Sequence, residues 1–163
     1  MKTIYLAGGC FWGTEKYFEQ FGGVVSTVVG YANGSTENPT YEEVKHGSGH
    51  AETVKIEYDE GVIPTEALLS RYFDVIDPLA VNKQGHDEGK QYRTGIYYED
   101  ESLLPAIRAE AKKLEEKLGQ PIAVEILPLK GFYPAEEYHQ KYLDKNPGGY
   151  CHIPANMLNL KEV

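Results

Sequence analysis

The sequence is short of cationic side chains and of long apolar segments, and it holds only two cysteines. Its 163 residues include 16 Lys and Arg against 25 Asp and Glu, so the formal net charge is −9 at pH 7. Nucleic-acid phosphates and anionic membrane faces favour basic proteins, and this charge therefore predicts neither as a partner. No apolar run approaches the roughly 20 residues that a membrane-spanning helix requires.

The first residues also lack the pattern of an export signal. The apolar run at 4–7 is interrupted by two glycines and is shorter than the core of a signal peptide. We therefore expect a cytoplasmic protein, in which thiols normally stay reduced. The two cysteines, Cys10 and Cys151, lie near opposite ends of the chain. A cysteine pair that bridges in the cytoplasm is more often transient and catalytic than structural.

Cys10 lies between a predicted strand at 4–7 and a predicted helix at 14–21. Neighbouring glycines allow the backbone to turn sharply there. At a helix N-terminus, unpaired N–H groups and the macrodipole favour the thiolate, so we predict a lowered pKa for the Cys10 thiol. The side chains of Phe11 and Trp12 would add an apolar pocket. The alternative is a buried cysteine that acts as a small hydrophobic residue, and the local pattern leaves both open.

Strand-like and helix-like segments alternate along the rest of the chain. Strands are predicted at 4–7, 24–29, 50–58, 94–98 and 122–126. Helices are predicted at 14–21, 64–76, 102–118 and 135–143, with a single turn at 41–44. This order contains the split βαβ pattern of a ferredoxin-like two-layer sandwich. We predict an α+β fold with a mixed, mainly antiparallel sheet, long loops and an irregular C-terminal tail.

Nothing in the composition divides the chain. It has no repeats, low-complexity tracts or linker-like shifts, so residues 1–163 are predicted to form one domain. Within it, residues 146–163 are predicted to be a flexible tail that carries Cys151. Long loops at 30–49 and 82–93 lie between the predicted strands, and loops of this length are often functional.

Glu52 occupies an unusual position in the strand predicted at 50–58. It shares its parity with the apolar residues Val54, Ile56 and Tyr58, which places it on the predicted core side of the strand. A carboxylate that enters the core is either paired with a cation or desolvated with a raised pKa. The alternative is a strand-end residue that points into solvent, which is common for Glu and is favoured by the local pattern alone.

The two cysteines together permit a redox cycle. If Cys10 were oxidised to a sulfenic acid, Cys151 on its tail could condense with it to form a disulfide. An external dithiol would then restore both thiols by exchange. An idle, exposed tail thiol is the alternative for Cys151.

Blocks of residues from Gly8 to Cys151 resemble the A-type peptide methionine sulfoxide reductases. The combination of CFWG at 10–13 with GHAE at 49–52 is highly specific. The full set of matching positions is GGCFWG at 8–13, GY at 30–31, NPTY at 38–41, GHAE at 49–52, QG at 84–85, Asp87, QYR at 91–93, YHQ at 138–140, NP at 146–147 and GYC at 149–151.

The resemblance implies reduction of the S epimer of methionine sulfoxide, free or in proteins, as a repair of oxidative damage. Cys10 would attack the sulfoxide sulfur while Glu52 protonates its oxygen, which makes the sulfur electrophilic. Cys151 would resolve the sulfenic acid, and thioredoxin would reduce the disulfide. The resemblance implies no metal or bound cofactor besides this external dithiol. We expect a monomer.

The resemblance also assigns the remaining site residues. Tyr41 and Tyr92 would donate hydrogen bonds to the sulfoxide oxygen, with Asp87 close by. Phe11 and Trp12 would take the methyl group, a role that suits aromatic edges near sulfur. Asp87 could instead shape its glycine-rich loop, and the two aromatic residues could be ordinary packing.

The chain departs from the family pattern in two places. Many members carry a further cysteine near the C-terminus, whereas none follows Cys151 here, so a two-thiol cycle is predicted. His86, Glu88 and Lys90 differ from the residues expected in their loop, which affects substrate preference and not the chemistry.

Four other interpretations remain as alternatives to this one. A cysteine hydrolase or acyltransferase would pair Cys10 with a histidine such as His50 and would not need Cys151. A thiol peroxidase would use the same thiols on another oxidant. A zinc site at His46 and His50 lacks an accompanying Cys-x-x-Cys. A ferredoxin-like binding module would bind its ligand without Cys10.

Overall fold

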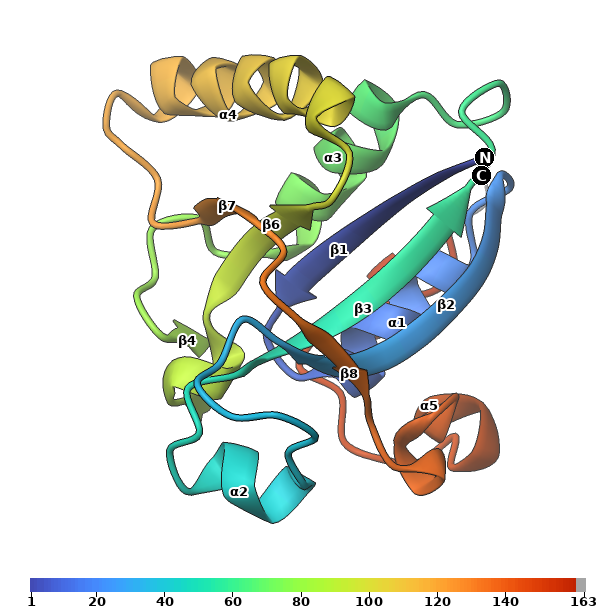
Figure 1. Cartoon of the computed structure of the whole chain (residues 1–163). Helices are drawn as coiled ribbons and strands as arrows, with labels where there is room; N and C mark the ends of the chain where they lie inside the picture. The colour runs from blue at the N-terminus through green and yellow to red at the C-terminus, as the bar shows by residue number, and fades with distance from the viewer. Residues whose placement is uncertain (161–163) are drawn as a thin grey trace.

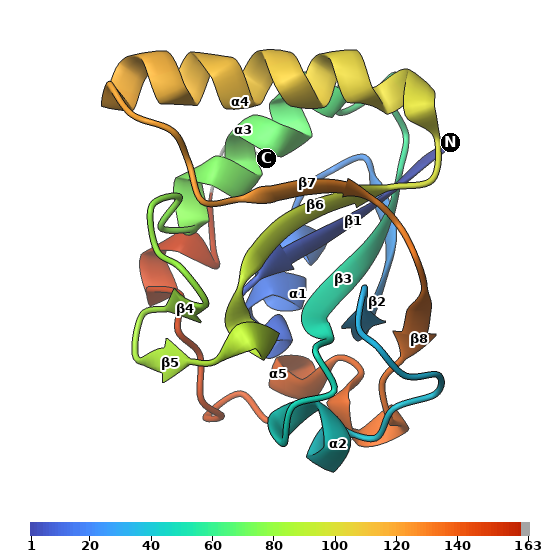
Figure 2. The ribbon, with the colours of Figure 1, turned by 60° about the vertical axis from the view of Figure 1, so that its left-hand side comes forward.

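The computed structural model describes residues 1–160 and contains a six-stranded, curled sheet with strand order β7-β6-β1-β3-β2-β8 (Figures 1 and 2). Its strands are β1 (Lys2–Gly8), β2 (Val24–Ala32), β3 (Ala51–Tyr58), β6 (Thr94–Tyr98), β7 (Glu125–Pro128) and β8 (Phe132–Pro134). The short strands β4 (Lys83–Gln84) and β5 (Asp87–Glu88) pair with each other. The helices are α1 (Phe11–Glu19), α2 (Tyr41–Lys45), α3 (Thr65–Val75), α4 (Leu104–Leu118) and α5 (Tyr142–Lys145). Short 3-10 turns lie at Lys90–Tyr92, Glu101–Leu103, Glu137–His139 and Ala155–Met157.

The strand order confirms the predicted ferredoxin-like arrangement. Four strands are ordered β6-β1-β3-β2, and each neighbouring pair among them is antiparallel. The connections through α1 and α3 therefore each join two parallel strands that are separated by one antiparallel strand. β7 adds a parallel strand beside β6, and β8 adds an antiparallel strand beside β2. The fold is α+β with a mixed, mainly antiparallel sheet, as expected.

The main core lies between one face of the sheet and the helices α1 and α3. Ile4 and Leu6 of β1 and Ile56 of β3 are fully buried against Phe18 of α1 and Leu68 of α3. Burying a side chain of this size contributes about 1.5–3 kcal/mol, so these contacts fix α1 firmly on the sheet. The turn between β1 and α1, which carries Cys10, is held in place as a consequence.

A second, smaller core lies on the opposite face of the sheet. Tyr5, Ala7 and Tyr97 are buried there, with Leu129 and Phe132 packed against them. Leu129 and Phe132 belong to the stretch from β7 to β8, which crosses the sheet from one edge to the other (Figure 2). Both faces of β1 and β3 are thus covered, which explains why these strands are buried almost throughout.

The helix predicted at 135–143 is wrong. The structure has a 3-10 turn at Glu137–His139 and a single helical turn, α5, separated by Lys141 in the left-handed region with φ 54°. The backbone N–H of Lys141 donates to Glu15 of α1 at 2.8 Å, and its Nζ donates to Glu19 at 3.1 Å and to Thr27 at 2.6 Å. These contacts with α1 and β2 outweigh the local helical periodicity.

Other boundaries differ by a few residues. α1 begins at Phe11 and not at residue 14, because Gly9, with φ 90°, completes the turn one residue before Cys10. The strand predicted at 122–126 is shifted to β7, and the helix predicted at 102–118 begins as a 3-10 turn before α4. The earlier start of α1 matters because it makes Cys10 the residue that caps the helix.

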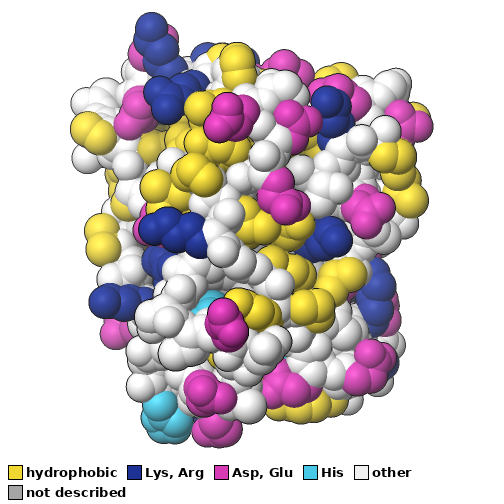
Figure 3. All heavy atoms as spheres, in the orientation of Figure 1, with side chains coloured by type: hydrophobic (Ala, Val, Ile, Leu, Met, Phe, Trp, Pro, Cys, Tyr) yellow, Lys and Arg dark blue, Asp and Glu magenta, His cyan; other side chains and the backbone are white. Residues whose placement is uncertain are grey.

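Acidic and basic side chains are interspersed on the face of the molecule drawn in Figure 3. Neither sign forms a continuous patch there, although acidic residues outnumber basic ones in the chain. Among residues 1–160, no helix combines the length and the hydropathy needed to cross a membrane.

Candidate active site

Cys10 is nearly buried at the junction of β1 and α1, with 7% of its surface exposed. The backbone at Gly9 passes close to Gln84 and His152, and only glycine fits there. A β-carbon on Gly9 would lie 2.8 Å from the Cβ of Gln84 and 2.9 Å from Nε2 of His152. Thr14 fixes the first turn of the helix, since its hydroxyl donates to the carbonyls of Gly8 and Cys10, both at 3.2 Å. The thiol is therefore held at the N-terminus of α1, inside a wall of packed residues.

The predicted low pKa of Cys10 is wrong for this structure. Burial raises the pKa of the Cys10 thiol well above its ordinary value, and the Glu52 carboxylate raises it further. The backbone N–H of Trp12, in the first turn of α1, lowers it by a smaller amount. The helix terminus alone would lower the pKa, but desolvation outweighs it and favours the protonated thiol in the free protein.

Glu52 lies on the core side of β3, as its parity predicts, and 1% of its surface is exposed. It accepts hydrogen bonds from the backbone N–H of Phe11 at 3.2 Å and from Nε2 of Gln91 at 2.9 Å. Burial raises the pKa of Glu52 to about 7, although both hydrogen bonds act in the opposite direction. Of the two alternatives for a core carboxylate, desolvation with a raised pKa is the one observed. Near neutral pH this carboxyl can donate a proton.

Three further predicted site residues come from different elements and lie around Cys10 and Glu52: Tyr41, Tyr92 and Asp87. Burial raises the pKa of both tyrosines, and the negative charge of Glu52 raises it further. The pKa of Tyr41 reaches about 12, and that of Tyr92 is raised as well. The charge of Asp87 raises the pKa of Cys10, Glu52 and Tyr92. Both phenols therefore stay protonated at neutral pH and are able to donate hydrogen bonds.

Asp87 has a second partner in the C-terminal segment. Its Oδ2 accepts a hydrogen bond from the hydroxyl of Tyr150 at 2.9 Å. Tyr150 directly precedes Cys151, so Asp87 links the start of β5 to the residues around the second thiol.

Phe11 and Trp12 begin an aromatic wall beside Cys10. Phe11 is buried, and its ring lies 5.6 Å from that of Tyr31 and 5.2 Å from that of His139. Trp12 stacks on Tyr142 with ring centroids 3.8 Å apart and 9° between the planes, and its Nε1 donates to Nδ1 of His139 at 3.0 Å. The indole is thus held by both a stacked ring and a hydrogen bond.

Three residues that sequence reasoning gave no role support the site. Gln91 holds Glu52, while His139 and Tyr142 hold Trp12. Gln91 and His139 lie within sequence blocks that match the family. This match is the one feature of the sequence that indicates a role for them. The stacking of Tyr142 could not be foreseen, because it depends on the break in the helix at Lys141.

Cys151 lies across the first turn of α1 although it is distant in the sequence. A β-carbon on Gly13 would be 2.8 Å from its Sγ, and an ionised Cys151 would raise the pKa of Cys10. The thiol is half-buried, its pKa is raised by burial, and its Sγ donates weakly to the carbonyl of Ile153 at 3.5 Å. The structure thus brings both cysteines, as free thiols, to the same helix terminus.

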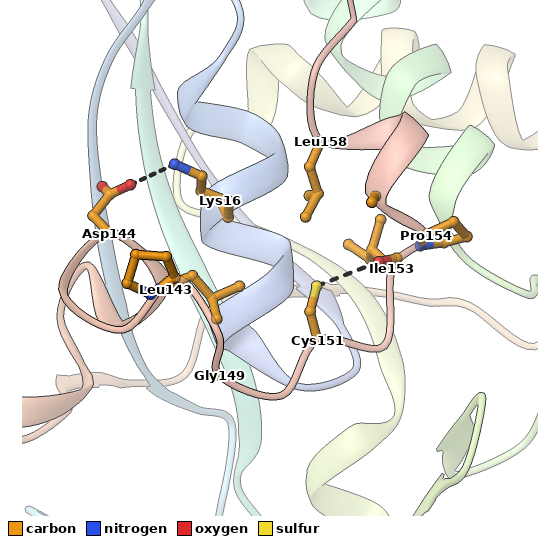
Figure 4. Close-up of a pocket in the computed structure, with 10 residues that line it drawn as sticks. Lys16, Leu143, Asp144, Gly149, Cys151, Ile153, Pro154 and Leu158 are labelled. Carbon is orange, nitrogen blue, oxygen red and sulfur yellow. Dashed lines mark hydrogen bonds and ion pairs between the residues drawn. The ribbon is translucent and has the colours of Figure 1, made fainter.

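A groove of about 590 Å³ opens beside Cys151, between α1, α5 and the C-terminal segment (Figure 4). Apolar side chains, among them Leu143, Ile153 and Leu158, line much of it, and the ion pair between Lys16 and Asp144 lies at one side. Cys10 is not among the lining residues, so Cys151 is the thiol that faces this groove.

The described residues do not support the alternatives that rest on histidine. His50 is buried, its Nδ1 is 2.8 Å from Oγ of Ser48, and neither ring nitrogen is hydrogen-bonded to Cys10 among the described residues. His46 is exposed and pairs with Glu42 at 3.4 Å. Within residues 1–160, no group of three or more His, Cys, Asp or Glu side chains is arranged to hold a metal ion.

Comparison with known proteins gives this arrangement its context. The family model of peptide methionine sulfoxide reductase matches residues 2–162. The chain belongs to that family. It is 63% identical over 153 residues to the peptide methionine sulfoxide reductase MsrA of Lachnoclostridium phytofermentans, which covers 93% of this chain and 92% of that protein. It is therefore an oxidoreductase that acts on methionine sulfoxide in peptides.

Solved structures agree with this assignment. Mxr1 from Saccharomyces cerevisiae in reduced form is 40% identical and superposes with a TM-score of 0.87 over 92% of this chain and 88% of that one. A second structure, of Mxr1 in complex with Trx2, is 29% identical and has a TM-score of 0.62, over 86% of this chain and 84% of that one. The fold is therefore shared with relatives of known structure.

Proposed function

We propose that the protein reduces the S epimer of methionine sulfoxide, in proteins or free, and so repairs oxidised methionine. In this proposal Cys10 is the nucleophile, Glu52 is the proton donor and Cys151 is the resolving thiol. The observation that carries it is the convergence of Cys10 and Glu52 on the first turn of α1, with a carboxyl whose pKa is raised to about 7.

The first step is reduction of the sulfoxide. Glu52 gives its proton to the sulfoxide oxygen, which makes the sulfur electrophilic, and the Cys10 sulfur attacks it. Two electrons pass from Cys10 to the substrate sulfur, and the oxygen is left on Cys10 as a sulfenic acid. The product is a methionine thioether. The proton from Glu52 stays on the oxygen as the hydroxyl of the sulfenic acid, and the thiol proton of Cys10 replaces it on Glu52.

The residues around these two groups position the sulfoxide. Tyr41 and Tyr92 donate hydrogen bonds to the oxygen, and protonated phenols are required for this. Asp87 adds negative charge that keeps the proton on Glu52, because it raises the pKa of that carboxyl. Phe11 and Trp12 form the apolar wall for the methyl group, and an aromatic edge is a favourable neighbour for sulfur.

The second step regenerates the thiol. Cys151 attacks the sulfenic acid on Cys10, a disulfide forms, and water leaves. We propose thioredoxin as the reductant of this disulfide, on the strength of the complex of the yeast relative with Trx2. No bound cofactor is needed in this cycle.

The organisation of the chain forms part of the proposal. Residues 1–163 would form one domain and act as a monomer in the cytoplasm, with 146–163 as the tail that carries Cys151. Residues 161–163 lie outside the described residues. The described part of the tail contacts α1, where Leu160 donates to Gln20 at 2.8 Å, so we propose that only the segment near Cys151 moves during disulfide formation.

A single turnover without reductant tests the cycle. We expect wild-type protein to form one methionine and to lose both free thiols, whereas C10S should form no methionine. C151S should form one methionine and retain a sulfenic acid that dimedone traps. A wild-type protein that produces methionine and keeps both thiols would refute the resolving role of Cys151.

A further inference from the structure

His152, the residue that follows Cys151, has an imidazole of defined orientation. Its Nε2 lies 2.8 Å from the carbonyl oxygen of Gly8, at the end of β1. A carbonyl can only accept, so Nε2 of the neutral ring carries the hydrogen and Nδ1 carries a lone pair. The hydrogen bond to Gly8 therefore sets the tautomer and leaves Nδ1 free to accept a proton.

Nδ1 of His152 is buried and has no hydrogen-bond partner among the described residues. A buried polar atom without a partner is costly and calls for an explanation. The atom lies on the same side of α1 as the sulfur of Cys151. A β-carbon on Gly13 would be 3.2 Å from Nδ1 of His152 and 2.8 Å from Sγ of Cys151. The separation between Nδ1 and Sγ therefore cannot exceed the sum of these two distances.

We propose that His152 is the base that accepts the thiol proton of Cys151 when Cys151 attacks the sulfenic acid on Cys10. This inference rests on the proposed function. As the proton moves from Sγ to Nδ1, the sulfur of Cys151 forms a bond with the sulfur of Cys10. The S–O bond of the sulfenic acid breaks, and the imidazolium returns the proton to the leaving hydroxide, which departs as water. No additional oxidant or reductant takes part.

The environment suits this transfer. Burial raises the pKa of Cys151, so its thiol needs a base before it can attack. Burial also lowers the pKa of His152, which keeps the ring neutral and ready to accept. Asp87 is the acidic group that faces the ring, and its charge opposes that lowering and stabilises the imidazolium once formed. Within residues 1–160, the hydrogen bond of this thiol is the weak contact with the carbonyl of Ile153, which bond rotation would release.

Substitution by Gln separates this role from simple anchoring. In H152Q, the side-chain amide can still donate to the carbonyl of Gly8, but nothing replaces the basic Nδ1. We expect H152Q to form its first methionine within about twofold of the wild-type rate. Disulfide formation at pH 7 should slow by roughly 10²-fold, since general-base catalysis typically contributes 10²–10⁴-fold.

The experiment is a rapid-quench single turnover without reductant, with methionine, free thiols and dimedone-trapped sulfenic acid counted from pH 6 to pH 9.5. H152Q should accumulate the sulfenic acid, and its disulfide should form faster as the pH rises, because hydroxide then ionises Cys151 directly. H46Q, which alters an exposed histidine on another loop, serves as the matched control and should behave as wild type.

The outcomes separate this inference from the proposed function. A wild-type protein that forms no methionine, or a C151S protein that yields no sulfenic acid, would refute the proposed cycle itself. A normal methionine burst in H152Q, followed by disulfide formation at the wild-type rate and with the wild-type pH profile, would refute the role of His152 alone. The burst also shows that H152Q is folded.

Discussion

Replacing Glu52 by Gln removes a proton donor while keeping the shape of the side chain. The amide oxygen can still accept from the backbone N–H of Phe11, and the amide of Gln91 can turn to present its own oxygen. E52Q is therefore expected to fold. Because general acid catalysis is typically worth 10²–10⁴-fold, the first methionine should form about 10²–10⁴ times more slowly, a loss of about 3–5 kcal/mol.

The pH profile provides a sharper test than the rate alone. In the proposed mechanism the reactive form needs a protonated Glu52, with a pKa of about 7, and an ionised Cys10, whose pKa is raised well above its ordinary value. Between these two pKa values the product of the two fractions is constant, so the wild-type rate should be flat above pH 7 and fall below it. In E52Q only the thiolate fraction matters, and the rate should rise about tenfold per pH unit up to the pKa of Cys10.

The same substitution should increase stability while it decreases the rate. The pKa of Glu52 is raised from 4.5 to about 7 on folding, so the unfolded chain releases this proton at lower pH than the folded one. The carboxyl therefore lowers the free energy of unfolding as pH rises from about 4.5 through 7, and the loss is complete above 7 at about 3 kcal/mol. At pH 8, E52Q should be more stable than wild type by up to that amount in urea denaturation.

E57Q is the matched control, since Glu57 lies on the same strand and has the opposite parity. It should keep the wild-type methionine burst and the flat pH profile. An E52Q protein whose burst at pH 7 is within about threefold of wild type would contradict the acid role. So would a slower burst whose pH profile runs parallel to that of wild type.

Three further substitutions test other contacts. Trp12→Phe keeps the stacked ring and loses the indole N–H bond, so KM in steady-state assays should rise about 2–10-fold with little change in kcat. Gly13→Ala places a β-carbon 2.8 Å from the Sγ of Cys151, and should slow thiol loss after a turnover while the methionine burst persists. Lys141→Met leaves the buried carboxylate of Glu15 without its cation and should lower the free energy of unfolding in urea by about 1–3 kcal/mol.

Local patterns mark the two residues at the centre of the site, although on their own they leave the roles of both open. The glycines around Cys10 mark a strand-to-helix turn, and that turn is where the structure has it. Glu52 is assigned to the core side by its parity with Val54 and Ile56, and the period of two leaves no other face for it once the strand is paired. Both inferences need only a few neighbouring residues, which is why they succeed.

The remaining features depend on contacts between distant segments. The pKa of Cys10 is set by burial and by a carboxylate on another strand, so its sign could not be deduced from the helix terminus alone. The break at Lys141 depends on Glu15 and Glu19 of α1, and the stack of Tyr142 on Trp12 follows from that break. Sequence periodicity describes one element at a time and carries no information on such pairs.

The different exposure of the two thiols has a consequence for how electrons enter the proposed cycle. Thiol–disulfide exchange proceeds by attack of a thiolate on one sulfur while the other leaves. In a disulfide between Cys10 and Cys151, the sulfur of Cys10 would be enclosed at the start of α1, whereas that of Cys151 faces the groove of Figure 4. We therefore expect a protein reductant to attack the sulfur of Cys151, with Cys10 as the leaving thiol. Cys10 then takes its proton in the same buried environment that raises its pKa, which returns the site to the resting state with both thiols protonated.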